Sequence, residues 1–600
     1  MTGRTVHSTR RAFLGGATAT ATAALGATAT RAAAEPRQTR GRRTGRRTGG
    51  RSVAVLGGGV AGLTAAQELA ERGFEVTVHE RKSALGGKAR SMDVPDSARG
   101  GRKPLPGEHG FRFIPGIYRN LPDTLRRIPF PGNPGGCHDN LVPATEVLIA
   151  RIGREDIRVP FGVVGTPPPV LTPDAFLRAV RGLLGTFANL PAHEIAYFAG
   201  RLLVWFTSCD RRRTEQWERV PWFDFTRANR MSPDYQRLLA IGITRNIIAT
   251  KAEVASTKTV GTCAEAFLFN LLGRGADGQP DRVLNAPTNE AWIDPWVNHL
   301  RSLGVRFHLG HEVRDLTLDG DRITEAVIQD AGGGRQSVTA DYFVSAMPVE
   351  HARTTWNERV RAADPQLARC DRLQTDWMTG VQFYLTQPTP IVHGHVNHID
   401  TPWSLTAVSQ AQFWSGRDFR ADYGDGMAAD CLSVDISEWN KPGILYGRTA
   451  KQCGREEVIR EVWAQMKAGL NDTGRTVLSD AALHSWFLDP AVQLGGPRPA
   501  NDEQLLIHPT GTWYDRPGAR TAIPNFFLAG DYVATDIDLA TMEGANAAAR
   551  SAVNALLEQA GSDAERCTVT PLYRAPELEG IKWQDEIRFR MGLGNVFDVG

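Results

Sequence analysis

Between residues 52 and 80 the pattern of apolar and polar positions changes twice. Residues 52–56 form a short apolar, β-branched run, which predicts a buried parallel strand. Small and apolar residues from Leu63 to Ala70 predict a helix, and Gly73 ends it. Apolar and polar residues then alternate from Phe74 to Glu80, as in a second strand. The folded part of the chain therefore begins with a strand–helix–strand unit.

The same pattern predicts elements further along the chain. Residues from about 145 to 285 read as largely helical and apolar on one face, most clearly over 175–184 and 192–207. A short helix is expected at 294–300 and a helix of small residues over 542–557. Strands are expected at 304–309, 312–316, 323–328, 340–348 and 379–385, and again before Gly530.

Aromatic residues recur from Trp403 to Trp414, close to the strand predicted at 379–385. We interpret this stretch as part of a sheet that floors an apolar cavity. Aromatic residues that only fill a core would give the same pattern.

The first predicted strand ends in a glycine motif. Gly57, Gly59 and Gly62 have the G-x-G-x-x-G spacing. The first glycine allows a tight turn, the second leaves room for a pyrophosphate against the backbone, and the third lets the helix lie close to the strand. Glu80 follows 23 residues after Gly57, where an acid accepts ribose hydroxyls. Together these features predict an adenine dinucleotide site, rather than a glycine-rich turn without a ligand.

Gly86-Gly87-Lys88 follows the acid directly. This element resembles the flavin amine oxidase and phytoene desaturase superfamily, in which a Gly-Gly-Arg sequence wraps FAD. Lys88 stands where that superfamily usually has arginine, and a lysine lacks the bidentate fork. The resemblance implies an α/β fold: a Rossmann-type FAD-binding domain of the glutathione-reductase-like, two-dinucleotide-binding kind, with an interleaved α+β substrate domain.

Two later segments carry the same resemblance. The order of elements from 294 to 348 resembles the middle flavin-binding segment, in which the residue at Val313 meets the adenine end through its backbone. Residues 524–532 and 542–545 resemble the carboxy-terminal FAD element, in which the acid at Asp531 meets the ribityl and pyrophosphate portion. The cofactor-binding residues that this reading implies are Gly57, Gly59, Ala61, Gly62, Glu80, Arg81, Gly87, Lys88, Val313, Gly530, Asp531 and Met542.

The substrate is read from the same resemblance. The Glu108-His109-Gly110 loop and the carboxy-terminal element look most like the carotenoid and phytoene desaturase branch. That branch implies desaturation or isomerisation of a small hydrophobic, isoprenoid substrate by hydride transfer to flavin N5. Glu108 and His109 are either active-site groups or hydrogen-bonding anchors of their loop, so no catalytic base is assigned.

Two alternatives stay open. One is an exported amine or amino-acid oxidase that uses oxygen. It is opposed by the absence of any lysine between Lys258 and Lys441, where many amine oxidases keep one near the flavin, and is favoured by the export signal. The other is a flavin-binding protein without catalytic activity.

The amino terminus indicates export. Thr9-Arg10-Arg11-Ala12-Phe13-Leu14 matches a twin-arginine pattern, and 32–34 offer a small-residue cleavage site. An arginine-rich linker follows, which we expect to be solvated; a basic arm on nucleic acid or anionic lipid is the alternative. Residues 1–51 carry a net charge of +10, so the formal +3 of the chain leaves −7 on residues 52–600. Nucleic acid is therefore not expected as a partner of the catalytic body. The twin-arginine export machinery and peripheral contact with a membrane are expected.

Composition and spacing limit the remaining chemistry. With 42% hydrophobic and 22% charged residues, the 600-residue chain is typical of a globular protein of two to four domains. Seven cysteines without a C-x-x-C pair give no metal or thioredoxin-type spacing. The expected boundaries are 1–34 signal peptide, 35–51 linker, 52–145, 286–350 and 521–560 for FAD binding, 146–285 and 351–520 for the substrate domain, and 561–600 for a tail.

Overall fold

The computed structural model describes residues 51–161, 172–187 and 190–598. The chain divides into two compact units, Met1–Gly45 and Arg46–Gly600, and the following concerns the second. The twin-arginine leader and all of the linker except Arg51 lie outside the described residues. Among the described residues, no helix is both long enough and apolar enough to cross a bilayer.

A five-stranded parallel sheet forms the centre of the dinucleotide-binding part. Its order is β23-β13-β1-β2-β9, which in order of appearance along the chain is 5-4-1-2-3. This is the doubly wound order, whose ligand site lies at the carboxyl ends of the strands where the order reverses, between β1 and β13. The strands span Ser52–Leu56 (β1), Glu75–Glu80 (β2), Arg306–Leu309 (β9), Tyr342–Ser345 (β13) and Phe526–Leu528 (β23).

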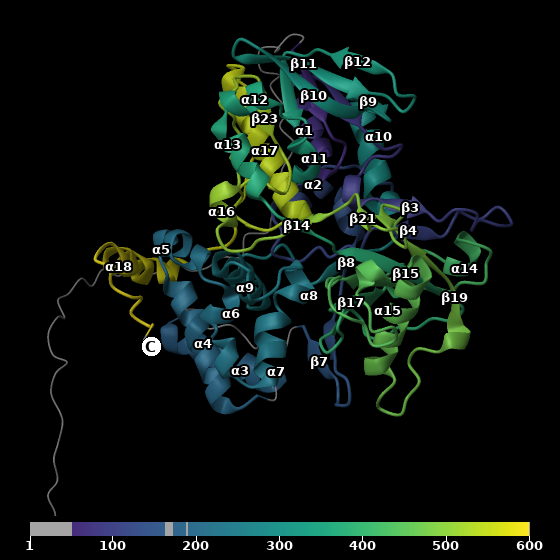
Figure 1. Cartoon of the computed structure of the whole chain (residues 1–600), viewed down its shortest axis with the longest axis vertical. Helices are drawn as coiled ribbons and strands as arrows, with labels where there is room; N and C mark the ends of the chain where they lie inside the picture. The colour runs from purple at the N-terminus through teal and green to yellow at the C-terminus, as the bar shows by residue number, and fades with distance from the viewer. Residues whose placement is uncertain (1–50, 162–171, 188–189, 599–600) are drawn as a thin grey trace, which may run out of the picture. The chain divides into compact units, whose positions relative to one another are not determined.

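Helices from distant parts of the chain pack around this sheet. Helix α1 (Val60–Ala70) lies beside α17 (Met542–Gln559) and α10 (Asp294–Ser302), as Figure 1 shows for α1 and α17 near the top of the view. Small side chains allow the close approach, since Ala65, Ala66, Ala549 and Ala552 are all fully buried in one cluster. The first and last sequence motifs are thereby brought together.

Two further sheets of three or more strands lie outside this parallel sheet in the described chain, one antiparallel and one mixed, in which β16 and β6 pair in parallel. The smaller has the order β10-β11-β12, with bounds Glu312–Asp319, Arg322–Gln329 and Arg335–Val338. The larger has seven strands in the order β19-β15-β18-β17-β16-β6-β7. Their bounds are Leu483–Leu488, Thr379–Leu385, Asp430–Ile436, Leu405–Ser409, His395–His398, Glu146–Ala150 and Ile157–Pro160. Helix α15 (Arg455–Leu470) packs its apolar face on this sheet.

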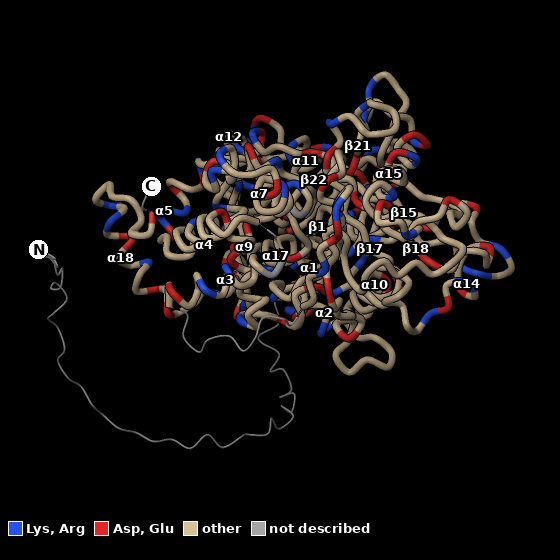
Figure 2. The backbone as a smooth tube through the Cα atoms, turned by 90° about the horizontal axis from the view of Figure 1, so that it is seen from below, with Lys and Arg blue, Asp and Glu red and all other residues tan. Residues whose placement is uncertain are grey.

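A helical part with its own core follows strand β7 in the sequence. It contains α3 (Pro173–Phe187), α4 (Ala192–Thr207), α8 (Arg245–Ile248) and α9 (Thr257–Leu271). Side chains of α3, α4 and α9 share one buried cluster, and Ala575 and Leu578 of the carboxy-terminal segment join it. Helix α18 (Glu579–Arg590) then follows in the tail. Figure 2 shows basic and acidic positions interspersed along the described chain rather than gathered in one region.

Most predicted elements are confirmed. The strands and helices expected between 52 and 80, between 294 and 348 and between 524 and 557 are present within a few residues of the expected ends. One expectation was wrong and another was confirmed only in part. Residues 146–160 contain strands β6 and β7 of the large sheet, not the start of a helical segment. The large sheet does line a cavity, through Thr406 among others, but the aromatic residues Trp403, Phe413 and Trp414 are buried in cores. A periodic apolar pattern does not say which neighbour a side chain will face.

The structure also shows the state of the cysteines. All seven lie in the described residues, and each is buried and unpaired. Residues 51–161, 172–187 and 190–598 contain no group of three His, Cys, Asp or Glu side chains arranged to hold a metal ion.

A buried histidine predicts how stability depends on pH. His398 of β16 is 1% exposed, and neither ring nitrogen has a partner within the described chain. Burial lowers its pKa from 6.5 to about 4. Between these values the unfolded chain binds a proton that the folded chain excludes. The free energy of unfolding therefore falls as the pH falls, by about 3 kcal/mol for this one group.

The measurement compares urea unfolding of the wild type and of His398→Gln at pH 7 and pH 4.5. All other titrating groups are shared, so the difference between the two pH dependences isolates His398. We expect the wild type to lose more stability on acidification than the variant. Equal losses in both proteins would contradict the burial argument.

Candidate functional site

One large cavity lies at the predicted end of the parallel sheet. Its volume is about 720 Å³, within the range of small-molecule sites. Segments from the front, middle and back of the chain line it, including the Gly57–Ala61 turn, the 311–314 strand start and the 530–545 region. Ala61, Val313 and Asp531, more than 450 residues apart at the extremes, face the same space.

The glycine turn has the geometry that its sequence predicts. Gly57 has φ +113°, and an added Cβ would lie 2.8 Å from the carbonyl oxygen of Ala346. An added Cβ on Gly62 would lie 1.9 Å from the oxygen of Gly57, because α1 touches β1 there. An added Cβ on Gly59 meets only the Cα of Gly87, at 3.7 Å. The turn therefore presents bare backbone and a helix N-terminus to the cavity.

Glu80 closes this turn from the end of β2. Its Oε2 accepts a hydrogen bond from the N–H of Gly58 at 2.7 Å, and its Oε1 accepts one from the N–H of Lys82 at 2.9 Å. Neighbouring Arg81 forms an ion pair with Glu503 at 3.2 Å and another with Asp502. Glu80 thus lines the cavity as a held carboxylate, and Arg81 ties the cofactor part to the 501–505 segment.

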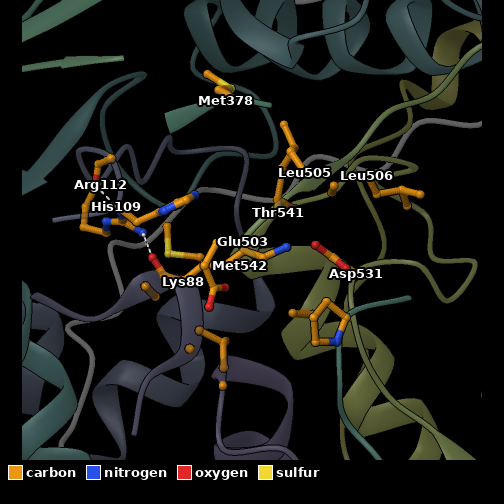
Figure 3. A pocket seen from close by; sticks show the side chains of 18 of the residues that line it. Lys88, His109, Arg112, Met378, Glu503, Leu505, Leu506, Asp531, Thr541 and Met542 are labelled. Atoms are coloured by element: carbon orange, nitrogen blue, oxygen red, sulfur yellow. Dashed lines mark hydrogen bonds between the residues drawn. The ribbon is translucent and has the colours of Figure 1, made fainter. Parts of the chain in front are cut away.

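Lys88 and Asp531 form the middle of the cavity wall. The Lys88 ammonium contacts Oε1 of Glu350 at 3.1 Å and the carbonyl of Gln504. Burial raises the pKa of Asp531, and the positive charge of Lys88 opposes that rise. Figure 3 shows Lys88, Asp531 and Met542 converging on one part of the cavity from three separate segments. Gly530 has φ +140°, which fits the glycine in this sharp turn.

Helix α17 begins at the cavity. Thr541 is its N-cap and accepts a hydrogen bond from the N–H of Gly544 at 2.9 Å, while Met542 and Ala545 line the cavity. The 18-residue helix aims its positive dipole end into this space. Glu543 turns away and accepts hydrogen bonds from the N–H groups of Asn120 and Leu121, at 2.8 Å each, at the start of α2 (Asn120–Arg126). The motif thus also caps a second helix.

Imidazoles gather near Val313. The rings of His79, His308 and His311 stack with centroids 5.0 to 5.5 Å apart. Burial, followed by repulsion from the other two, lowers the pKa of His79 to about 4. At neutral pH the His79 ring, which lines the cavity, is therefore uncharged, and its flat face suits a purine ring.

Every residue predicted to bind the cofactor lines the cavity except Gly62, which lies one turn into α1 against the strand. The adjacent residues Glu108 and His109 have different surroundings. Glu108 lies outside the cavity lining and accepts a hydrogen bond from the hydroxyl of Thr288 at 2.6 Å, so it anchors the loop. His109 lines the cavity, with its Nδ1 2.8 Å from Oδ2 of Asp489.

Beyond Met542 the cavity becomes apolar. Its walls come from the loop after β4 (Pro106–Glu108), from α8 and α9 and from the large sheet. Helices α3 and α4, the clearest of the predicted helices, share a core with α9 and contribute no residue to the lining. The described apolar lining residues here are Phe111, Phe113, Ile117, Val147, Phe161, Ile248, Phe267, Leu271, Val396 and Leu539.

A few polar groups interrupt this apolar part. Asp435 of β18 is buried, and burial raises its pKa to about 7 although Arg112 and His395 oppose the rise. His395 of β16 lies 2.6 Å from Asp281 through Nδ1 and Oδ2. Sequence analysis did not find Asp281, His395 or Asp435. They belong to no motif, and only the pairing of the large sheet brings them to one wall.

The geometry can be compared with known proteins. Residues 60–557 match the family described as flavin containing amine oxidoreductase. The chain is 24% identical to the zeta-carotene desaturase of Synechocystis sp. over 538 residues, which cover 84% of this chain and 97% of that protein. It is also 24% identical to the carotenoid phi-ring synthase of Streptomyces griseus over 532 residues, covering 85% and 88% of the two chains.

Solved structures share the fold. Cyclohexylamine oxidase from Brevibacterium oxydans aligns with a TM-score of 0.55 and 13% identity, over 85% of this chain and 99% of that chain. An oxidoreductase from Methanosarcina mazei aligns with a TM-score of 0.53 over 84% of this chain. These likenesses confirm the α/β fold. The match to a flavin-containing family over residues 60–557 shows that the chain is a flavin-dependent oxidoreductase and that its cofactor is FAD.

The cavity fits that cofactor. A bare glycine turn and the N-terminus of α1 suit a pyrophosphate, and the N-terminus of α17 suits the electron-rich pyrimidine edge of a flavin. A Cβ at Gly59 would protrude where no protein atom of the described chain fills the space. When bound, FAD supplies a two-electron acceptor for hydrogen removed from a substrate. The protein must then orient the substrate, exclude water and handle the remaining proton.

Proposed function

The chain belongs to the flavin containing amine oxidoreductase family, and from that premise we propose that it dehydrogenates or isomerises a long apolar isoprenoid of the carotenoid class. The observation that carries this proposal is the continuity of the cavity. One space joins the Lys88–Asp531 part to a chamber lined by Phe111, Phe113 and Phe267. A hydrocarbon chain gains about 25 cal/mol for each Å² that such a surface removes from water. The alignment with the zeta-carotene desaturase of Synechocystis sp. covers 84% of this chain and 97% of that protein, and it supports the same substrate class.

An amine oxidase is the second candidate, and one observation favours it. Two buried carboxyl groups, Asp281 and Asp435, line the cavity and would attract an ammonium ion. His395 already contacts Asp281, and Arg112 lies near Asp435, so both acids have cationic or hydrogen-bonding neighbours before any substrate enters. Because neither acid is left without a neighbouring partner for an ammonium ion to replace, these contacts favour the isoprenoid substrate over the amine.

The test supplies both substrate classes to the FAD-loaded protein without oxygen. We expect an acyclic carotenoid polyene in detergent to bleach the visible flavin absorbance and to shift its own absorption to longer wavelength as conjugation extends. A set of small amines, added in the same buffer, is expected to leave the flavin oxidised. Bleaching by an amine alone would reverse the assignment.

The proposed substrate has consequences for location. A polyene of this class resides in a bilayer, so we propose peripheral membrane contact, with hydride transfer to flavin N5 inside the cavity. Export by the twin-arginine route is proposed from Arg10 and Arg11. Cell fractionation tests both, and recovery of the protein only in the soluble cytoplasm would exclude them.

A further inference from the structure

A half-buried histidine and a buried aspartate meet in the apolar part of the cavity. His395 begins β16, in the middle of the large sheet, and Asp281 precedes β8 (Arg282–Leu284). The Nδ1 of His395 lies 2.6 Å from Oδ2 of Asp281, and both residues line the cavity. Asp281 is 3% exposed. Placing polar groups among apolar side chains costs free energy, which the hydrogen bond between His395 and Asp281 offsets.

The pair fixes the orientation of the imidazole. In the neutral imidazole, Nδ1–H of His395 donates to the Asp281 carboxylate, and Nε2 is the nitrogen that holds the lone pair. Phe111 and Phe113 contact the ring with centroids 4.7 and 5.2 Å away, one tilted and one edge-on, and restrict its rotation. Within the described chain, Nε2 is buried and has no hydrogen-bond partner.

Charged neighbours shape the environment of this nitrogen. Besides Asp281, the groups that interact with this corner are Asp435 of β18 and, around Asp435, Arg112 and Glu108. Asp281 also interacts with Arg282, the residue that follows it. With Nδ1–H held by the carboxylate, Nε2 is the ring nitrogen at which a proton can be taken up.

We propose that Nε2 of His395 is the proton acceptor of the dehydrogenation, with Asp281 as its positioning residue. The inference rests on the proposed function. Forming a double bond between two adjacent carbons removes a hydride equivalent from one and a proton from the other. FAD, when bound, supplies the acceptor for the hydride equivalent. His395 takes the proton, and the electron pair of that C–H bond becomes the second bond between the carbons. The proton then passes from His395 to solvent, so atoms and charge balance.

Isomerisation would use the same group. Removing a proton from an allylic carbon and returning it at another position moves a double bond without net oxidation. One proton-carrying side chain beside a polyene therefore accounts for either outcome of the proposed function.

The test uses two variants and one matched control. His395→Gln keeps a hydrogen bond to Asp281 but has no basic nitrogen. Asp281→Asn donates to Nδ1, which moves the histidine proton to Nε2 and blocks the acceptor. His398→Gln changes another buried histidine of the same strand that does not line the cavity. We expect the anaerobic rate of flavin bleaching to fall about 100-fold or more in the first two variants and to stay within about twofold in the control.

A second measurement does not depend on turnover. Nitrogen-15 NMR of labelled histidine in the resting protein reports which ring nitrogen carries the proton. We expect an unprotonated Nε2 and a protonated Nδ1 for the resonance that disappears in His395→Gln, and the opposite pattern in Asp281→Asn. Substrate affinity, measured by quenching of protein fluorescence, is expected to change little in all three variants.

The outcomes separate this inference from the proposed function. The rates of the variants are measured with whichever substrate class bleaches the flavin of the wild type. If that class is an amine, the proposed function is wrong, and the same rates still test the role of His395. Wild-type rates in His395→Gln, or a protonated Nε2 in the resting protein, would overturn the assignment of His395.

Discussion

Replacing Gly59 by valine is expected to weaken the binding of FAD while leaving the fold in place. Gly59 has φ −79°, an ordinary value for any residue, and an added Cβ has only the Cα of Gly87 nearby, at 3.7 Å. The chain can therefore accommodate the side chain, which then occupies the space beside the backbone where the pyrophosphate must lie. Overpacking of this kind costs about 1–3 kcal/mol, so the affinity for FAD should fall roughly tenfold to hundredfold.

The measurement is the flavin absorbance per protein after desalting, followed by titration of the apoprotein with FAD. Gly580→Val is the matched control, because an added Cβ at Gly580, in α18, meets nothing within 4 Å and Gly580 does not line the cavity. Circular dichroism of both apoproteins should be unchanged. Full flavin content in Gly59→Val would mean that the pyrophosphate does not lie against this turn.

The elements around the cofactor could be predicted because their signals are local. At Gly57 and Gly62 the backbone approaches so closely that an added Cβ would lie 2.8 Å and 1.9 Å from a carbonyl oxygen. The period of the apolar positions changes from strand to helix at the same place. Glu80 ends β2 and Asp531 lies three residues after the end of β23, and the carboxyl ends of these parallel strands share one edge. The chain order of these signals was therefore enough to predict a single cavity.

The substrate chamber could not be predicted in the same way. His395 and Asp281 are 114 residues apart and follow no shared spacing. They meet because β16 pairs with β6 and β17, and strand pairing across hundreds of residues leaves no local trace. The tryptophan at 403 illustrates the converse. Its aromatic neighbourhood suggested a cavity wall, but the face of β17 on which it packs belongs to the core.

A buried charge network ties the last cofactor element to the helical part. Asp538 accepts hydrogen bonds from Lys258 Nζ at 2.8 Å, from the hydroxyl of Thr259 at 2.9 Å and from Arg516 at 2.8 Å. Arg516 also donates to the carbonyl oxygens of Asp531 and Val533, at 2.9 and 2.6 Å. Burial would raise the pKa of Asp538, but Lys258 and Arg516 outweigh it and hold the pKa below its usual value. The acid is therefore ionised, and it fixes the loop that carries Asp531.

We expect Asp538→Asn to lower the free energy of unfolding by about 3–5 kcal/mol, because it leaves the Arg516 side chain, which is 0% exposed, without its counter-ion. Asparagine tolerates the φ of +51° at this position, so the variant tests charge rather than backbone strain. Urea unfolding of the apoprotein gives the value. Glu456→Gln is the control, since its pair with Arg460 is two-thirds exposed or more on both sides and should cost less than about 0.5 kcal/mol. The loop that presents Asp531 should loosen with the network, so the affinity of Asp538→Asn for FAD should fall as well. Unchanged stability would mean that water or a shifted side chain forms hydrogen bonds with Arg516 in place of Asp538. Apolar packing alone would then hold the last cofactor element against the helical part.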